Sequence, residues 1–539
     1  MEKKTLWAVV ISFLLFFGWQ KLYLEPQASA PNTVSQDQLS QTQAGSETTQ
    51  ISNEALDQIK TKKQRVLKNA AQLKPKESVQ TVSLKIQNAN VTLGNGPHLL
   101  RDWQLDGYRR SKKANAPKVD LETLVHKTSS LQFAFDREDL GYLTTASGNL
   151  VHSEEGKAVW QFEDENVELK RIVTYREDSP FLNVTFEGRF KTRPASHAFV
   201  FLSAQAIDSD EDLIDRHLIY WTKDEIQWVS LDGAVEFESI SSPVRWIGST
   251  NRYFTAAIVN QDRSIPSRGL IQPVSSGGGR ISMIYPLSGE RFSIPTRVYF
   301  GPKDLDILRK IEPTLDHTVD FGWFTFLAYP ILRLMKWLYD YFHNFGIAII
   351  LMTLLLKIVT FPLNYKSMKS MKQMAALKPQ IDRIQKKHKD NPEAKNREMM
   401  MLMKNQGYNP LAGCLPILVQ MPVFFALYRV LYSSVELYQA PFILWINDLS
   451  VRDPYFVTPI LLTVTMFLQQ KLTPNAATDP MQQKIMQWMP IFFGAIMVTL
   501  PSGLTLYMLV NALASIIQQL VLNKKLDAGS PSVVRTSRA

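Results

Sequence analysis

Hydrophobic residues are concentrated at the N-terminus and in the last third of the chain, and polar residues dominate between them. The first apolar run, Leu6–Leu24, follows Lys3 and Lys4, an order typical of a signal peptide or an uncleaved membrane anchor. We favour an anchor spanning residues 1–24, because the Ala-x-Ala match at Ala28–Ala30 lies far beyond the apolar run. Five further apolar segments are predicted to be membrane helices, namely Phe345–Leu363, Gly413–Ser433, Tyr455–Gln470, Ile485–Leu500 and Gly503–Leu522.

Two of these segments are short. Tyr455–Gln470 and Ile485–Leu500 have about 16 residues each, fewer than the roughly 20 needed to cross a hydrocarbon core. Each also contains a proline, Pro459 or Pro490. We therefore expect the bilayer to be thinned around this bundle, or the short helices to be shielded by their neighbours.

Basic residues set the predicted orientation. The loop between Lys366 and Lys404 contains eleven Lys and Arg residues against four Asp and Glu, which predicts that it is cytoplasmic. Alternation of the spans then predicts six transmembrane helices, with both chain ends in the cytoplasm and a basic cytoplasmic tail at residues 523–539. The same alternation exports the chain from about Glu25 to Phe342.

The exported part begins with a predicted tether, residues 25–80, which has no aromatic residue and cannot bury enough apolar area to fold. Period-2 runs such as Val82–Ile86 and Leu182–Phe186 follow, separated by Gly and Pro breaks. We expect a β-sandwich domain over residues 81–320. Residues 321–343 then predict an amphipathic helix lying in the outer membrane interface, and a surface helix docked on the sandwich is the alternative.

Candidate catalytic and metal chemistry in the exported part is sparse. Asp208, Asp210 and Asp212 are spaced as in a calcium loop, but Leu213 stands where that loop needs Gly, so we expect a solvated acidic turn. Gly277–Gly279 lacks the Lys-Ser/Thr of a phosphate-binding loop and predicts a hairpin turn. The single Cys, Cys414, excludes an intrachain disulfide. We therefore expect no metal, no cofactor and no enzymatic activity.

Polar residues inside the predicted spans are the main candidate site. Lys357 is the one charge in its segment, about 9 Å from the cytoplasmic end, and a lysine that close to an interface could simply extend to it. However, Gln420 and Ser515 lie at a similar predicted depth. Gln518 is nearer the cytoplasm, and Thr353 and Asn511 are nearer mid-membrane. Because polar groups facing lipid are costly, this set predicts a water-filled cavity open to the cytosol and closed toward the outside.

Such a cavity suggests passage of polypeptide. A charge at the bilayer centre costs about 2.5–3.5 kcal/mol on insertion scales, and a half-membrane hydrophilic groove would remove much of that cost. A hydrophobic segment could leave along an apolar wall formed by Met421, Phe424 and Phe425 together with Phe492 and Phe493, although ordinary helix packing or lipid contact explains any one of these residues equally well. Arg429 is an exception whose direction, outward or into the cavity, stays open.

The cytoplasmic loop, residues 366–405, predicts a helical hairpin. Apolar residues including Met371 and Met374 recur at helical spacing, and Asp390–Pro392 marks the turn. Its basic face, including Lys369 and Lys372, could contact anionic lipid or ribosomal RNA, and its Met surface suits varied apolar partners. A hairpin that only packs its own seam is an equally good interpretation.

Several strings resemble the YidC/Oxa/Alb family of membrane protein insertases, in its Gram-negative type with a large periplasmic domain. The strings are Asn409–Pro416, Gln420–Pro422, Asp479–Lys484, Pro501–Leu504, Arg252–Phe254 and Tyr299–Lys303. The resemblance covers nearly the whole chain apart from the tether and the tail.

The resemblance implies an inner-membrane protein with a periplasmic β-supersandwich and a five-helix core over residues 344–522. It implies insertion of nascent membrane proteins into the lipid bilayer, alone or with the Sec translocon and the ribosome, without a small-molecule cofactor. It assigns the groove charge to Lys357, polar groove positions to Thr353 and Gln420, and a substrate contact to Tyr507. Asp479 and Lys484, in the second cytoplasmic loop, join the hairpin as expected partner-binding residues.

This chain departs from the resemblance at two positions. The best-known members carry Arg where this chain has Lys357, and Lys cannot make the same two-pronged contact with a carboxylate. Arg429 stands where an uncharged residue is expected. Two other function classes remain as alternatives: a transporter or channel with a periplasmic ligand-binding domain, and a carbohydrate-processing sandwich, against which the lack of a paired-carboxylate or His constellation speaks weakly.

Overall fold

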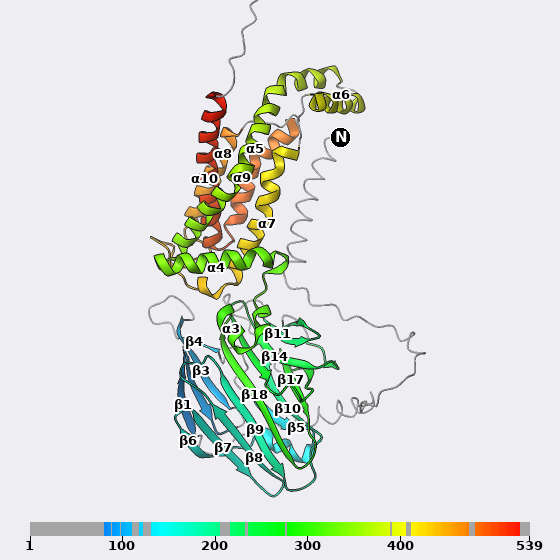
Figure 1. Cartoon of the computed structure of the whole chain (residues 1–539), viewed down its shortest axis with the longest axis vertical. Helices are drawn as coiled ribbons and strands as arrows, with labels where there is room; N and C mark the ends of the chain where they lie inside the picture. The colour runs from blue at the N-terminus through cyan, green and yellow to red at the C-terminus, as the bar shows by residue number, and fades with distance from the viewer. Residues whose placement is uncertain are drawn as a thin grey trace, which may run out of the picture. The chain divides into compact units, whose positions relative to one another are not determined.

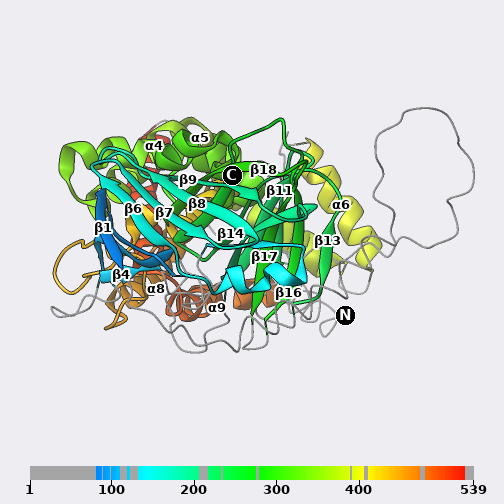
Figure 2. The same ribbon diagram turned by 90° about the horizontal axis from the view of Figure 1, so that it is seen from below.

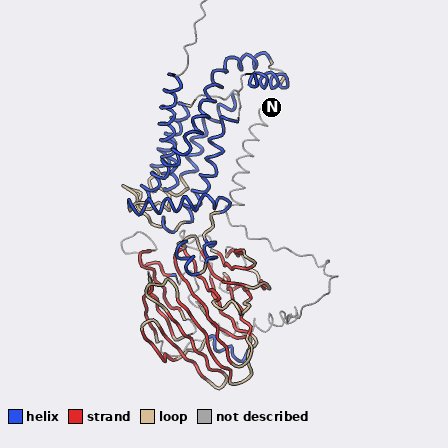
Figure 3. The backbone as a smooth tube through the Cα atoms, viewed as in Figure 1, coloured by secondary structure: helices blue, strands red, loops and turns tan. Residues whose placement is uncertain are grey.

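The computed structural model describes residues 80–87, 89–96, 99–109, 118–121, 131–204, 216–231, 235–274, 278–388, 391–405, 411–473 and 480–528. The predicted anchor, nearly all of the tether, the Asp208–Asp212 turn and most of the tail lie outside the described residues. The chain divides into two compact units at Val319 and Asp320. Described residues before this point are mostly strand and those after it mostly helix (Figure 3).

The strand-rich unit contains three antiparallel sheets. The order is β1-β2-β3-β4 in the first, β13-β16-β17-β10-β5 in the second and β12-β11-β14-β15-β18-β9-β8-β7-β6 in the third. The strands are β1 (Thr81–Ile86), β2 (Ala89–Gly94), β3 (Leu100–Arg109), β4 (Lys118–Asp120), β5 (Gln132–Phe135), β6 (Asn149–Glu154), β7 (Lys157–Glu163), β8 (Val167–Thr174), β9 (Leu182–Phe190), β10 (His197–Ala204), β11 (His217–Thr222), β12 (Glu225–Ser230), β13 (Glu238–Ile240), β14 (Val244–Thr250), β15 (Phe254–Asn260), β16 (Arg268–Pro273), β17 (Gly279–Pro286) and β18 (Arg291–Pro302).

The two smaller sheets pack on the same face of the nine-stranded sheet. Phe133 on β5 stacks on Phe186 of β9 with ring centroids 4.5 Å apart, and Trp103 on β3 lies 5.1 Å from Phe300 of β18. The alternation in β8, where every second residue is buried, is what such a two-layer core demands. The expectation of a mostly β domain is confirmed, and Figure 2 shows β7, β8 and β9 side by side in the large sheet.

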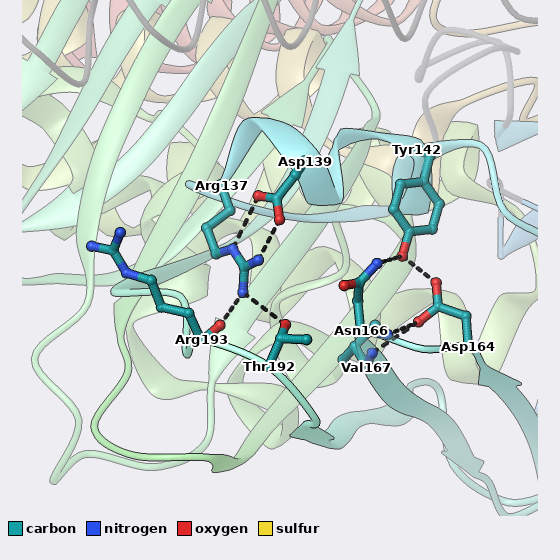
Figure 4. Close-up of polar contacts among 8 residues, drawn as sticks. All are labelled: Arg137, Asp139, Tyr142, Asp164, Asn166, Val167, Thr192 and Arg193. Carbon is teal, nitrogen blue, oxygen red and sulfur yellow. Dashed lines mark hydrogen bonds and ion pairs between the residues drawn. The ribbon is translucent and has the colours of Figure 1, made fainter.

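A polar cluster beside the 3-10 helix η2 (Glu138–Thr144) fixes loops in this unit (Figure 4). Asp164 accepts hydrogen bonds from the backbone N–H groups of Asn166 and Val167 at 2.7 and 2.8 Å and from the Tyr142 hydroxyl. Arg137 pairs with Asp139 in the same view. Asp164 closes the β7–β8 turn through these hydrogen bonds. We therefore assign the polar cluster a structural role in this unit.

The second unit is helical. After the short α3 (Leu305–Ile311) and η4 (Pro313–Thr318) of the first unit, it contains η5 (Gly322–Phe324), α4 (Thr325–Phe342), α5 (Phe345–Lys387), α6 (Pro392–Asn405), α7 (Leu411–Ser433), η6 (Val435–Leu437), α8 (Val457–Leu472), α9 (Pro480–Met497) and α10 (Ser502–Ala528) (Figure 1). Within the described residues, two helices are long and apolar enough to cross a membrane, Phe345–Lys387 and Ser502–Lys524, and Met486–Met497 is a shorter apolar stretch.

α5 is longer than the predicted span. It continues without a break through Pro362 and Pro379 into the predicted cytoplasmic hairpin, and its 43 residues extend about 64 Å at 1.5 Å per residue. Asn344 caps its start by accepting hydrogen bonds from the N–H groups of Gly346 and Ile347. The first helix of the predicted hairpin is therefore continuous with the apolar helix that begins at Phe345.

α4 packs against α5 and α7 within the helical unit. Its buried face consists of Ala328, Ile331, Leu332, Met335 and Leu338. Tyr341 is 67% exposed and lies against the exposed Trp337 on the open side.

Candidate functional site

A polar stripe runs along the inward face of α5. Thr353, Lys357, Thr360 and Asn364 recur at helical spacing, and Thr353 and Lys357 are buried, Lys357 at 9% exposure. The opposite face is apolar and open, and Ile358, next to the lysine, is 69% exposed. In a bilayer that open face would meet lipid, so the stripe faces the other helices.

α10 carries the matching stripe. Tyr507, Asn511, Ser515 and Gln518 follow one another every three or four residues, and the helix contacts α5, α7 and α8. Ser515 donates its hydroxyl hydrogen to the Asn511 carbonyl at 2.8 Å, which leaves its oxygen free to accept.

The two stripes meet at Lys357. Its Nζ donates to Oγ of Ser515 at 2.7 Å, and Nε2 of Gln518 donates to the Lys357 carbonyl at 3.1 Å. Nδ2 of Asn364 donates to Oε1 of Gln518 at 3.2 Å. Within the described part of the chain, no carboxylate lies within ion-pair distance of Lys357, so a buried cation has only neutral partners.

We call the contact between the polar stripes of α5 and α10 the polar seam. Gln420 on α7 contacts α10 at a different height from Lys357. Its amide donates to the Tyr507 hydroxyl, and Tyr507 lies eight residues, or about 12 Å, before Ser515 on α10. Lys357 and Ser515 are therefore in contact, whereas Gln420 meets α10 two turns further toward the start of that helix. Thr353 is buried and bonds to the Ile349 carbonyl of its own helix at 2.6 Å.

The residues of the expected apolar wall divide into two sets. Phe424 and Phe493 pack around the buried cluster of Leu462, Met497 and Ala512, which joins four helices. Phe425 is buried and stacks on Phe324 with centroids 5.8 Å apart. Met421 and Phe492 are exposed.

Arg429 does not extend toward the polar seam. Its Nη1 lies 3.3 Å from Oδ2 of Asp320, just before α4, and Oγ of Ser433 donates to the Asp320 carbonyl at 3.4 Å. A second ion pair, Lys336 with Glu436 at 3.5 Å, joins α4 to the segment after α7. The ion pair of Arg429 thus joins α7 to the segment that leads into α4.

Asp453, in the loop before α8, is a second carboxylate, after Asp320, whose oxygens have partners within the helical unit. Asp453 is buried and accepts hydrogen bonds from the Thr458 N–H and hydroxyl, both at 2.8 Å, and from the Tyr455 N–H at 3.0 Å. Burial acts to raise the pKa of Asp453, but these hydrogen bonds outweigh it and hold the pKa below its usual value. The Thr458 hydroxyl lies 3.0 Å from that of Thr505 on α10, so the network joins α8 to α10.

The hairpin both packs its own seam and leaves side chains open. Met374 and Ile381 are buried, Met371 is half-buried, and Lys369 and Met400 are exposed. Glu398 of α6 accepts hydrogen bonds from Lys387 and His388 of α5, which hold its pKa below the usual range.

Lys372 donates to the Asn523 carbonyl near the end of α10 at 3.2 Å, so this lysine is engaged within the bundle. Asp479 and the side chain of Lys484 lie outside the described residues.

The sequence missed Thr360 and Asn364. Both continue the face of Thr353 and Lys357, since Thr360 is three residues after Lys357 and Asn364 is four residues after Thr360. Asn364 lies one residue beyond the predicted span, whereas Thr360 lies within it. Among the described residues, no group of three or more His, Cys, Asp or Glu side chains is arranged to hold a metal ion.

Two family models match the chain. Residues 100–334 match the YidC periplasmic domain, and residues 337–529 match the 60Kd inner membrane protein family.

Full-length relatives agree with these models. The chain is 33% identical to the membrane protein insertase YidC of Geobacter metallireducens, over 98% of this chain and 99% of the relative. It is 33% identical to that of Campylobacter jejuni, over 97% and 96% of the two chains. Identity to the Geotalea daltonii insertase reaches 46% over 53% of this chain and 54% of the relative.

Proposed function

The chain belongs to the YidC family of membrane protein insertases, inner-membrane proteins with a periplasmic domain, and we propose that its insertion groove is the polar seam between α5 and α10. The observation that carries this proposal is the contact between Lys357 and Ser515, a buried cation held by a neutral hydroxyl. Membrane-embedded charges are costly and are otherwise paired, so an unpaired one marks a functional position.

Substrate binding is an exchange of partners at Lys357. A carboxylate of an acidic substrate segment replaces the Ser515 hydroxyl, and the exchange is favourable because a contact with a neutral hydroxyl becomes one between opposite charges. The Ser515 hydroxyl bonds to Lys357 again when the substrate leaves. The Lys357 ammonium group therefore has an acceptor both with and without substrate. Because Lys presents a compact charge in place of the Arg fork, it accepts carboxylates in many orientations.

The hydrophobic part of the substrate takes a second path. It leaves the seam along the surface formed by Met421, Phe424 and Phe493 and enters lipid sideways. The shortness of α8, with 16 residues, supports a locally thinned bilayer on this path. The substrate then pays the desolvation cost of its polar segment over only part of the membrane.

The proposed topology has five core helices, α5 and α7–α10, and a sixth at the N-terminal anchor. The hairpin of α5 and α6 and both chain ends are cytoplasmic, and the mostly β domain, a β-supersandwich, is periplasmic. Support comes from the basic residues of the hairpin and from the length and apolar character of α5 and α10.

The proposed partners are nascent membrane proteins, membrane lipid, the ribosome and the Sec translocon. The exposed Lys369 and Met400 and the half-buried Met371 support contact of the hairpin with a polar or apolar partner, while Lys372 and Met374 serve the internal packing. Asp479 and Lys484 complete the proposed cytoplasmic contact surface. A transporter finds no support among the relatives, which are named membrane protein insertases. The exchange of partners proposed at Lys357 requires no covalent chemistry.

Charge reversal at the groove tests the proposal. Lys357→Glu in proteoliposomes is expected to lower insertion of a substrate with an acidic N-terminal segment by roughly tenfold or more, because repulsion replaces attraction. Lys357→Arg should retain insertion, and a substrate with a neutral segment should be affected less. Normal insertion of the acidic substrate by a fully folded Lys357→Glu protein would refute the electrostatic role.

Thiol accessibility tests whether water reaches the seam. In a Cys414→Ser background, Lys357→Cys is expected to react with a membrane-impermeant thiol reagent added from the cytosolic side. Ile358→Cys is the matched control, since it lies at the same depth on the lipid-facing side. Equal protection of both cysteines would show that the seam is sealed.

A further inference from the structure

A buried arginine interrupts the apolar face of β8. Arg171 is 7% exposed and lies on the same inward face as Leu169 and Val173. In the sheet register it lies between Trp160 of β7 and Phe186 of β9, two of the largest fully buried side chains of the domain. Burial lowers the pKa of Arg171 to about 10, so its guanidinium is still charged at neutral pH.

The guanidinium reaches the turn that follows β2. Nη1 of Arg171 donates to the Gly96 carbonyl at 2.6 Å, which ties the nine-stranded sheet to the four-stranded one. A carbonyl accepts a hydrogen bond but supplies no negative charge. The free-energy cost of burying the cation is therefore only partly offset.

A second arginine lies on the same turn. A Cβ added at Gly94 would lie 2.7 Å from Nε of Arg101, and one added at Gly96 would lie 3.6 Å from its Nη2. The absence of a side chain at Gly94 is what lets the Arg101 guanidinium lie against the backbone. Arg171 from the core and Arg101 from the rim thus converge on Gly94–Gly96.

Donors outnumber acceptors around this turn. Nε of Arg101 and Nε1 of Trp160 are buried and have no hydrogen-bond partner among the residues that the structure describes. The Asn95 acceptors are already used, since its carbonyl accepts from the Gly148 N–H at 2.8 Å and its side-chain oxygen accepts from the Gln80 N–H at 3.2 Å. Among the described residues, the Arg171 guanidinium bonds to a neutral carbonyl, and burial is the cause of its lowered pKa. The site therefore has two positive charges and unused N–H groups with nothing to receive them.

We propose that this cluster, formed by Arg171, Arg101 and Trp160 around Gly94–Gly96, binds a small oxyanion of the phosphate, sulfate or carboxylate class. Bidentate guanidinium contacts to such anions are short and strong. A water molecule could accept from the same donors, but it would leave both charges uncompensated. The anion bridges the four-stranded and nine-stranded sheets, so its binding stabilises the folded domain. The anion is either free in solution or part of a larger molecule such as a lipid headgroup.

The binding experiment uses the full chain in phosphatidylcholine nanodiscs, whose headgroup carries no net charge, in a buffer without inorganic phosphate. Radiolabelled inorganic phosphate is expected to bind one site per chain and to raise the unfolding midpoint at constant ionic strength. Arg101→Met should weaken binding by about tenfold or more, as expected for a lost charged hydrogen bond. Gly94→Ala should do the same, because the added methyl group displaces Arg101. Arg189→Met is the control, since Arg189 forms an exposed pair with Glu290.

A second arm identifies the source of the anion. In phosphatidylglycerol nanodiscs, weaker phosphate binding by the unaltered protein than in phosphatidylcholine would show that a headgroup occupies the site, and equal binding would show that the ligand is a free anion. The proposal is overturned if neither phosphate, sulfate nor acetate binds. It is equally overturned if Arg101→Met and Gly94→Ala bind phosphate as Arg189→Met does. Since Arg101 is at the rim, its variant remains informative even where Arg171→Met fails to fold.

Discussion

The helical unit contains two sets of buried polar groups, and they differ in how charge is balanced. At the Asp453 and Arg429 end, each charged group is well satisfied: Asp453 accepts three hydrogen bonds from neutral donors, and Arg429 pairs with the carboxylate of Asp320. At the seam, the Lys357 ammonium group bonds, among the described residues, to the Ser515 hydroxyl alone. In the first set, the Asp453 network joins α8 to α10, and the Arg429 pair joins α7 to the segment before α4. The second set joins α5 to α10 around a cation that has no counter-charge among the described residues.

This difference separates a structural role from a functional one. A carboxylate with several hydrogen bonds stabilises the fold, and removal of one partner leaves buried groups unsatisfied. A cation without a counter-charge contributes little to stability and remains available to a ligand. We therefore expect substitutions in the first set to change stability, and those in the second to change insertion with the fold intact.

Asp453→Ala should give the largest loss of stability. The N–H groups of Thr458 and Tyr455 and the Thr458 hydroxyl lose their acceptor, which we expect to lower the free energy of unfolding by about 2–4 kcal/mol. Thermal unfolding of the variant and of the unaltered protein in detergent measures this loss of stability. An unchanged midpoint would remove the distinction between the two sets.

The same carboxylate predicts a pH dependence. Because the pKa of Asp453 is lower in the folded protein, its stabilisation is present above the unfolded-state pKa, about 3.9, and is lost as pH falls through the folded pKa. The unfolding midpoint of the unaltered protein should therefore fall more steeply below about pH 4 than that of Asp453→Ala. Parallel pH profiles for the two proteins would argue against this contribution.

Asp320→Ala should have the next largest effect. This change leaves the buried Arg429 without its carboxylate. Since Asp320 is itself 39% exposed, we expect the free energy of unfolding to fall by about 1–3 kcal/mol. The double variant Asp320→Ala/Arg429→Met should recover part of the loss, because no charge then remains buried. A double variant that is less stable than the sum of the two single changes would show that the pair is not the cause.

Ser515→Asp should change stability least, by less than about 1 kcal/mol, while lowering insertion of acidic substrates strongly. The new carboxylate pairs with Lys357 and gives this lysine a counter-charge, as Asp320 does for Arg429. Ser515→Asn is the control of similar size without charge. Equal insertion of an acidic substrate by both variants would contradict the proposed exchange of partners at Lys357.

The sequence alone determined the class of the molecule and the faces of its elements. Two-residue alternation predicted the strands, of which Val82–Ile86 falls in β1 and Leu182–Phe186 in β9, and apolar runs predicted where α5 and α7–α10 lie. Lys357 stood out because a charge inside an apolar helix is rare on energetic grounds. These features depend on local chemistry that can be read residue by residue.

Only the tertiary structure decided which groups meet. Helical periodicity gives the face of a side chain but neither the relative depth nor the rotation of two packed helices. For this reason the sequence could not tell that Lys357 would contact Ser515 while Gln420 would contact Tyr507. Likewise, Asp320 and Arg429 are 109 residues apart, and Arg171 and Gly96 are 75 apart. Such pairs are set by packing of whole elements against each other, which depends on the shape of every side chain at the contact.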